Sequence, residues 1–226
     1  MPLNSAITAL ALQNGCPLVG FADLRCLPVA SRCNLDYGIV FALPFSQEAI
    51  RENKNDRPQQ YNDEHTPQNQ IFKTLKTQTA DFLRAKGYEA VIDTPAAVIE
   101  DETLRAQLSQ KAVATLAGIG WIGKNAMLVT PQFGAAVRMT VVLTDAPLEC
   151  GTPITQSRCP PQCTICADVC PGNAIKGGLW AVGVDRDEFF DAHACRDACT
   201  ARSKRLLDLN QNLCGLCIAH CPCTRI

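Results

Sequence analysis

Cysteine residues in the last third of the chain form the strongest chemical pattern in the sequence. A C-x-x-C-x-x-x-C-P motif occurs twice, at Cys163–Pro171 and at Cys214–Pro222. Cys159 precedes the first copy and Cys195 precedes the second, so each run offers four thiols. Thiolates that surround a compact body from several sides are the ligands of an iron–sulfur cubane. Because the motif is doubled, we predict two [4Fe-4S] clusters.

The proline after the last cysteine of each run suggests how the ligands are shared. In the bacterial ferredoxin spacing, the cysteine before proline ligates the cluster of the other run. We therefore predict two crossed ligand sets: Cys159, Cys163, Cys166 and Cys221 for the first cluster, and Cys195, Cys214, Cys217 and Cys170 for the second. Cys199 is an alternative to Cys195. Cys150 and Cys223 are left over.

So many cysteines have two alternative uses, namely structural zinc and disulfides. Structural zinc sites also use C-x-x-C pairs, but two Cys-Pro endings fit them less well. Disulfides are rare in a reducing compartment. The first residues carry no charged segment followed by an apolar segment and a cleavage site, so we expect no secretory signal peptide and a cytoplasmic location.

Composition narrows the class of protein further. The chain has 226 residues and a formal net charge of -1, which provides no general basic field for nucleic acid. One local basic cluster, residues 202–205, is interpreted as a solvated helix face. No apolar run approaches the roughly 20 residues of a membrane span, so we expect no membrane partner. Because the cysteines concentrate after residue 150, we predict an α+β domain over residues 1–150 and a two-cluster ferredoxin-like domain over residues 151–226.

Hydrophobic periodicity predicts a mixture of helices and strands in the first domain. Helices are expected around Ile7 and over residues 72–83 and 96–117, the last with a break near Ser109 as an alternative, and strands over residues 18–22, 37–43, 88–92, 127–130 and 137–144. Residues 51–70 are polar and contain prolines, so we expect a surface excursion there. The elements do not alternate strictly as βαβ units, which favours an N-terminal α+β layer.

A glycine-rich loop at residues 118–125 imitates two nucleotide-binding motifs. It matches both G-x-G-x-x-G and G-x-x-x-x-G-K. These motifs require a strand before the loop and a helix after it, whereas a helix is predicted before this loop and a strand after it. We predict instead that Gly120, Trp121, Gly123, Lys124 and Asn125 border a bound cofactor or substrate. A purely structural turn is the alternative.

Several segments resemble the epoxyqueuosine reductase family. They are the glycine-rich loop with the following residues 126–131, the segment Leu143-Thr144-Asp145, the segment ending in Ala194-Cys195, and the early strand at residues 19–23. The resemblance favours Cys195 over Cys199 as a ligand. It implies a corrinoid-type α+β domain followed by a two-cluster ferredoxin-like domain. It also relates the chain to corrinoid-dependent reductive dehalogenases.

The resemblance implies an iron–sulfur oxidoreductase. Electrons would pass from a low-potential donor such as ferredoxin or flavodoxin, through the two [4Fe-4S] clusters, to a reductive site in the first domain. The acceptor is left open between a corrinoid (cobalamin) and a small molecule. Two other functions stay open, namely an electron-transfer adaptor without catalysis of its own and a corrinoid-reactivating protein.

Three departures from the family pattern affect these expectations. The chain ends at Ile226, whereas longer members carry a C-terminal extension that contacts tRNA, so we expect tRNA not to be a partner. The family's proton-donating aspartate has its nearest match in Asp93, which lies farther from Trp121 than in the family, so we assign no catalytic residue. Pro222 is followed by Cys223, where longer members usually carry an aromatic residue.

Overall fold

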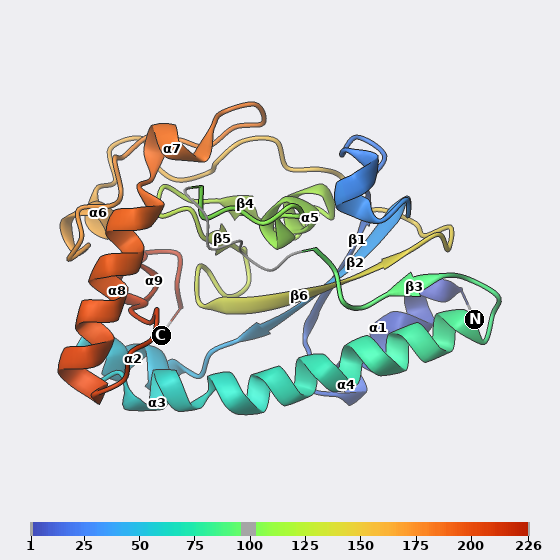
Figure 1. The fold of residues 1–226 in the computed structure, drawn as a ribbon, viewed down its shortest axis with the longest axis horizontal. Helices are drawn as coiled ribbons and strands as arrows, with labels where there is room; N and C mark the ends of the chain where they lie inside the picture. The colour runs from blue at the N-terminus through green and yellow to red at the C-terminus, as the bar shows by residue number, and fades with distance from the viewer. Residues whose placement is uncertain (1, 96–102, 226) are drawn as a thin grey trace. The chain divides into compact units, whose positions relative to one another are not determined.

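The chain forms two compact units whose segments are interleaved in the sequence. The computed structural model describes residues 2–95 and 103–225 (Figure 1). The first unit contains Met1–Leu43, Pro67–Ile119 and Arg138–Ile154, and the second contains Pro44–Thr66, Gly120–Val137 and Thr155–Ile226. The sequence predicted a single boundary at residue 150. Two earlier segments, including the glycine-rich loop from Gly120 onward, belong instead to the cysteine-rich unit.

A four-stranded sheet forms the central layer of the first unit. Its strand order is β1-β2-β6-β3, with bounds β1 Leu18–Asp23, β2 Tyr37–Pro44, β3 Ala90–Val91 and β6 Val137–Thr144. β1 pairs antiparallel with β2, and β3 pairs antiparallel with β6. The strands predicted at residues 18–22, 37–43 and 137–144 are confirmed, and the one predicted at 88–92 is reduced to two residues.

Two amphipathic helices complete the core of this unit. They are α1 Leu3–Gln13 and α4 His65–Arg84, the long helix in Figure 1. Both bury apolar side chains spaced three or four residues apart, against side chains of β2 and β6. Their buried residues are Ile7 and Ala11 on α1, and Phe72, Leu75, Ala80 and Leu83 on α4. The helices predicted around Ile7 and over residues 72–83 are therefore confirmed.

Two expectations about local structure were wrong. Residues 51–70 were expected to be a surface excursion, but the chain forms α2 Gln47–Lys54, α3 Gln59–Asp63 and the start of α4. These helices are polar outside and bury only a few residues, such as Ile50 and Tyr61, which explains the weak periodicity. The helix predicted over residues 96–117 is confirmed only as α5 Gln110–Leu116, which begins after the N-cap Ser109. Residues 103–109 are not helical, and residues 96–102 lie outside the described part of the chain.

Short elements and long connecting segments build the second unit. A small hairpin pairs β4 Trp121–Ile122 with β5 Leu128–Val129. The cysteine-rich segments carry α6 Ile165–Asp168, α7 Arg186–Phe189, α8 Ala192–Leu207 and α9 Leu216–Ala219. A small apolar cluster contains Ala126, Ala174, Ile175, Phe189 and Phe190, and four cysteines pack against it. The mixed α/β character that the sequence predicted is confirmed.

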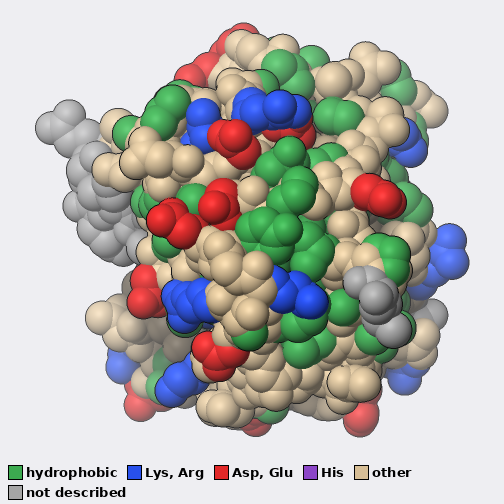
Figure 2. Space-filling view, turned by 90° about the vertical axis from the view of Figure 1, so that its right-hand side faces the viewer, with side chains coloured by type: hydrophobic (Ala, Val, Ile, Leu, Met, Phe, Trp, Pro, Cys, Tyr) green, Lys and Arg blue, Asp and Glu red, His purple; other side chains and the backbone are tan. Residues whose placement is uncertain are grey.

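The face of the molecule in Figure 2 carries no large patch of only positive or only negative side chains. Lys and Arg side chains alternate there with Asp and Glu side chains. Over the part of the chain that the structure describes, none of the helices has the length and apolar character needed to span a bilayer.

The core of the first unit can be tested by shortening one of its buried side chains. Leu75 on α4 is fully buried, whereas Leu12 on α1 is 60% exposed. We expect Leu75→Ala to lower the free energy of unfolding by about 2–5 kcal/mol, because it leaves a cavity. The control Leu12→Ala should change it by less than about 0.5 kcal/mol. Urea unfolding followed by circular dichroism measures both, and equal effects would contradict this core.

Candidate metal centre

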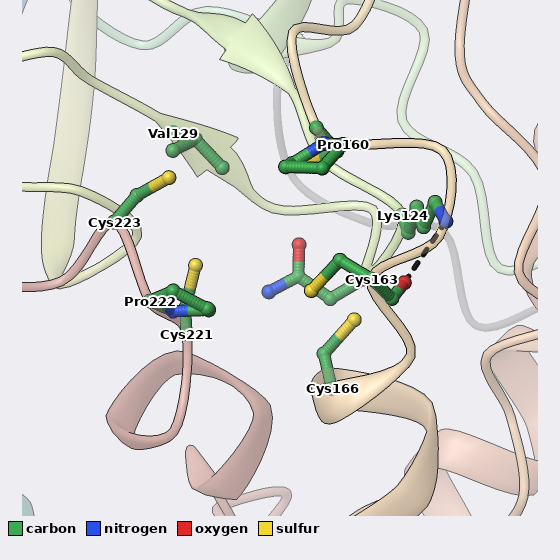
Figure 3. A pocket seen from close by; sticks show the side chains of 10 residues that line it. Lys124, Val129, Pro160, Cys163, Cys166, Cys221, Pro222 and Cys223 are labelled. Carbon is green, nitrogen blue, oxygen red and sulfur yellow. Dashed lines mark hydrogen bonds between the residues drawn. The ribbon is translucent and has the colours of Figure 1, made fainter.

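A cavity of about 100 Å³ in the second unit is lined by five thiols. A single water needs only about 10–15 Å³ of such space, so the cavity can hold a compact group of several atoms. Figure 3 shows the sulfur atoms of Cys163, Cys166, Cys221 and Cys223 directed toward the enclosed space. Cys159 completes the lining thiols. Cys221 from the second run therefore lies with three cysteines of the first run, as the crossed arrangement requires.

Tight turns bring these cysteines to the cavity. The N–H of Cys163 donates to the Pro160 carbonyl at 3.1 Å, and Cys166 lies on the one-turn helix α6 that follows. Cys221 directly follows α9 and its C-cap His220. Helices this short cannot be stable alone. Their positions must therefore be set by contacts with other segments of the unit.

The glycine-rich loop supplies two of these contacts. Lys124 is 4% exposed and Asn125 is 2% exposed, and both line the cavity. The Lys124 Nζ donates to the carbonyls of Pro161 at 2.7 Å and Cys163 at 2.9 Å. The Asn125 amide donates to the carbonyl of Cys217 at 3.4 Å. One loop therefore binds the backbone of both cysteine runs. The amine of Lys124 is occupied by two carbonyl acceptors.

The other loop residues that the sequence predicted at a site are Gly120, Trp121 and Gly123, and all three are closely packed. A Cβ atom at Gly123 would lie 2.8 Å from the Asn125 Oδ1 and 3.5 Å from the Cys159 Sγ. A Cβ atom at Gly120 would lie 2.4 Å from the carbonyl oxygen of Val129. Only glycine lets the backbone come this close. Trp121 is buried in β4, with Arg158 stacked over its ring at 5.8 Å from the centroid.

The second predicted ligand set, together with the alternative ligand Cys199, lies near α8 and α9. Cys195 and Cys199 are one helical turn apart, and their sulfur atoms are 3.8 Å apart. Cys199 is also hydrogen-bonded to Cys214. Burial, and then the nearby Cys195, Cys214, Cys166 and Cys170, disfavour ionisation of Cys217. The second predicted set is thus brought together, with Cys199 beside it.

A buried arginine, Arg202, connects α8 to neighbouring segments by hydrogen bonds. The side chain of Arg202 is 3% exposed, although residues 202–205 were interpreted as a solvated helix face. Its Nη1 donates to the Cys214 carbonyl and the Asn53 Oδ1, both at 3.0 Å, and its Nη2 donates to the Asp56 carboxylate at 2.9 Å. Asn53 itself donates to the Cys214 carbonyl at 3.0 Å. Only the position of Arg202 on the inner face of α8 could have revealed this role.

Burial and mutual proximity raise the pKa of several of these thiols. Burial raises the pKa of Cys221 to about 12, although the N–H groups of Cys223 and Thr224 partly offset the effect. Burial and the neighbouring cysteines also raise the pKa of Cys217. Conversely, the hydrogen bond from Cys199 lowers the pKa of Cys214 to about 6. Metal ligands are thiolates, so a metal that binds here must displace protons.

The donor set and its spacing fit an extended group better than a single ion. All 14 cysteines lie in the described ranges, and within these ranges they form no disulfide. Within residues 2–95 and 103–225, no three His, Cys, Asp or Glu side chains form a group that could hold one metal ion. Five of the thiols instead surround a cavity, as the corners of a cubane require.

A larger and more open cavity of about 610 Å³ lies in the first unit. Three basic side chains and one acidic side chain line it: Lys73, Lys76, Arg138 and Asp93. Its volume falls within the range of small-molecule sites, and its positive lining favours a ligand with an anionic group. Asp93 is the residue that the sequence suggested as the nearest match to a family proton donor.

Comparisons with known proteins identify the relatives of this chain. No family model matches it. An epoxyqueuosine reductase of Bacillus anthracis is 44% identical over 73 residues, which make up 32% of this chain and 19% of that protein. An epoxyqueuosine reductase of Listeria monocytogenes is 31% identical over 134 residues, or 59% of this chain and 32% of that protein. The matched stretches thus span a third or less of these relatives' lengths.

Solved structures share the fold over almost the whole chain. A catabolic reductive dehalogenase, NpRdhA, matches 98% of this chain and 32% of its own with a TM-score of 0.67 at 21% identity. A selenomethionine-labelled epoxyqueuosine reductase matches 98% of this chain and 65% of its own with a TM-score of 0.60 at 21% identity. These identities show a common fold. Together with the curated relatives, they confirm the resemblance to epoxyqueuosine reductases that the sequence indicated.

The contacts of Arg202 provide a test of how the cysteine segments are held. We expect Arg202→Met to lower the free energy of unfolding by about 1–3 kcal/mol, because it leaves the buried Cys214 carbonyl and Asn53 side chain without a donor. Arg205 lies three residues further on the same helix and is exposed, so Arg205→Met should change it by less than about 0.5 kcal/mol. Urea unfolding under anaerobic conditions measures both. Equal stability of the two variants would show that Arg202 does not support this region.

Proposed function

We propose that this chain is an iron–sulfur oxidoreductase of the epoxyqueuosine reductase type, with one [4Fe-4S] cluster in each thiol set. One observation carries the proposal. Cys221 of the second run lies in the same cavity as Cys159, Cys163 and Cys166 of the first run. Neither a chance cluster of buried thiols nor a zinc site confined to one run needs that exchange of the last cysteine.

The residues present fit the two clusters in different ways. For the first cluster, Cys159, Cys163, Cys166 and Cys221 would be the ligands, with Lys124 as a nearby cation that stabilises the anionic thiolates. For the second, Cys170, Cys195, Cys214 and Cys217 would be the ligands, with the Arg202 cation hydrogen-bonded to the Cys214 carbonyl. The clusters would supply one-electron transfer. The chain's own residues hold them, exclude water and tune their potentials through charge and hydrogen bonds.

The open cavity of the first unit is the proposed acceptor site. Its positive lining and the exposed Asp93 suit an acceptor that carries an anionic group and takes up a proton on reduction. A corrinoid or a small molecule is the proposed acceptor, and a ferredoxin or flavodoxin of the cytoplasm is the proposed donor. One structural neighbour is an epoxyqueuosine reductase with an epoxyqueuosine-modified tRNA stem loop, so this RNA is included in the test below.

Metal analysis of the anaerobically purified protein tests the proposal directly. We expect about eight iron and eight sulfide per chain, because two cubanes are present. Reduction with dithionite should produce electron paramagnetic resonance signals of reduced clusters. Stoichiometric zinc in place of iron would contradict the proposal.

Acceptors can then be compared with the same sample. The reduced protein is mixed with a corrinoid or with the epoxyqueuosine-modified stem loop, and reoxidation of the clusters is followed by visible absorbance. Reoxidation with turnover of an acceptor supports an enzyme. Clusters that reduce only a partner protein would favour the adaptor.

The crossed ligand sets make a further prediction about iron content. In a Cys163→Ser/Cys166→Ser background, only the second cluster should form, with about four irons. Adding Cys170→Ser should remove these irons, because Cys170 belongs to the second set. If they stay, each run holds its own cluster and the crossing is wrong. Adding Cys199→Ser is the matched control and should leave the four irons, whereas their loss would make Cys199 a ligand in place of Cys195.

A further inference from the structure

The first cavity has one thiol more than a cubane needs. Cys159, Cys163, Cys166 and Cys221 would fill the four corners, yet Cys223 also lines the cavity. Its sulfur atom points toward the same enclosed space as that of Cys221, from the opposite end of Pro222 (Figure 3). Cys223 is partly exposed. Its position is therefore not explained by burial as a small apolar residue.

The two thiols are carried by one rigid turn. The N–H of Thr224 donates to the Cys221 carbonyl at 2.9 Å, which closes a four-residue turn with Pro222 and Cys223 at its centre. The Thr224 hydroxyl donates to the Ile218 carbonyl at 2.9 Å and accepts from the N–H of Ala135 at 3.2 Å. These bonds involve the backbone and Thr224. The turn should therefore keep its shape when the side chain of Cys221 or Cys223 is replaced.

A neighbouring segment presses the turn against the cavity. A Cβ atom at Gly134 would lie 2.2 Å from the carbonyl oxygen of Cys223, so the backbone of the 130–134 turn packs directly on that residue. Pro222 restricts the backbone between the two thiols. Neither end of the turn is free to swing Cys223 out of the cavity.

We propose that Cys223 is a reserve ligand for the cluster corner that Cys221 fills. This inference rests on the proposed cluster in this cavity. When the Cys221 side chain is absent, the Cys223 thiol releases its proton to solvent and its sulfur binds the same iron, so the number of thiolate ligands stays at four. No oxidant or reductant is needed, because one thiolate replaces another.

Alanine variants test the inference by iron content. We expect Cys221→Ala to keep about eight irons per chain, and Cys221→Ala/Cys223→Ala to fall to about four, because the first cluster is then lost. Cys223→Ala alone should keep about eight. The matched control is Cys163→Ala, which also removes one thiol from this cavity and should fall to about four. A fall to about four with Cys221→Ala alone would overturn the inference.

Thiol labelling gives a second measurement that does not depend on counting iron. Iodoacetamide treatment of the anaerobic holoprotein, followed by peptide mass mapping, should label Cys223 in the wild type and leave it protected in Cys221→Ala. If the alanine variant does not fold, Cys221→Ser, which is close in size to cysteine, is used for the same measurement. Labelling of Cys223 in both proteins would show that it never binds the cluster.

The wild-type iron content separates this inference from the proposed function. About eight irons in the wild type with loss of four in Cys221→Ala rejects only the reserve ligand. A wild type without iron rejects the proposed clusters, and with them the role of Cys223.

Discussion

The backbone carbonyls of the cysteine segments depend on buried side chains from elsewhere in the same unit. Apart from α8, these segments have only one-turn helices, so many of their carbonyls lack regular hydrogen-bond partners. Lys124 binds Pro161 and Cys163, Asn125 binds Cys217, and Arg202 binds Cys214. Hydrogen bonds from cations to buried acceptors contribute about 1.5–3 kcal/mol each. These contacts hold the cysteine segments in place, including those that line the cavity.

This dependence explains why the glycine-rich loop belongs with the cysteines. Its glycines let the loop pack against Val129 and Asn125 without side chains in the way. Its lysine and asparagine then reach the two cysteine runs from one position. The loop matches a phosphate-binding motif in its sequence pattern but not in its structural context. α5 precedes it, β4 lies within it and β5 follows it, and its lysine amine donates to two protein carbonyls.

Much of the site could be predicted from local patterns, because ligand spacing is a property of short segments. The repeated cysteine motif indicated that Cys221 would join the first run, and the structure brings it there. Arg202 was missed because four consecutive polar residues do not reveal which of them faces inward. Asn53 was missed because its helix buries few apolar residues, so the segment was expected to be a surface excursion. Both residues act through contacts between segments about 150 positions apart in the sequence, and no local pattern records such contacts.

The central claim is that thiols of two separate runs enclose iron–sulfur cubanes. X-ray absorption at the iron edge of anaerobically purified protein tests it most directly. The account predicts iron with a shell of sulfur neighbours and, beyond it, the short iron–iron scattering of a cubane. A sample whose metal is zinc in isolated tetrahedral sulfur sites, with no metal–metal scattering, would contradict it.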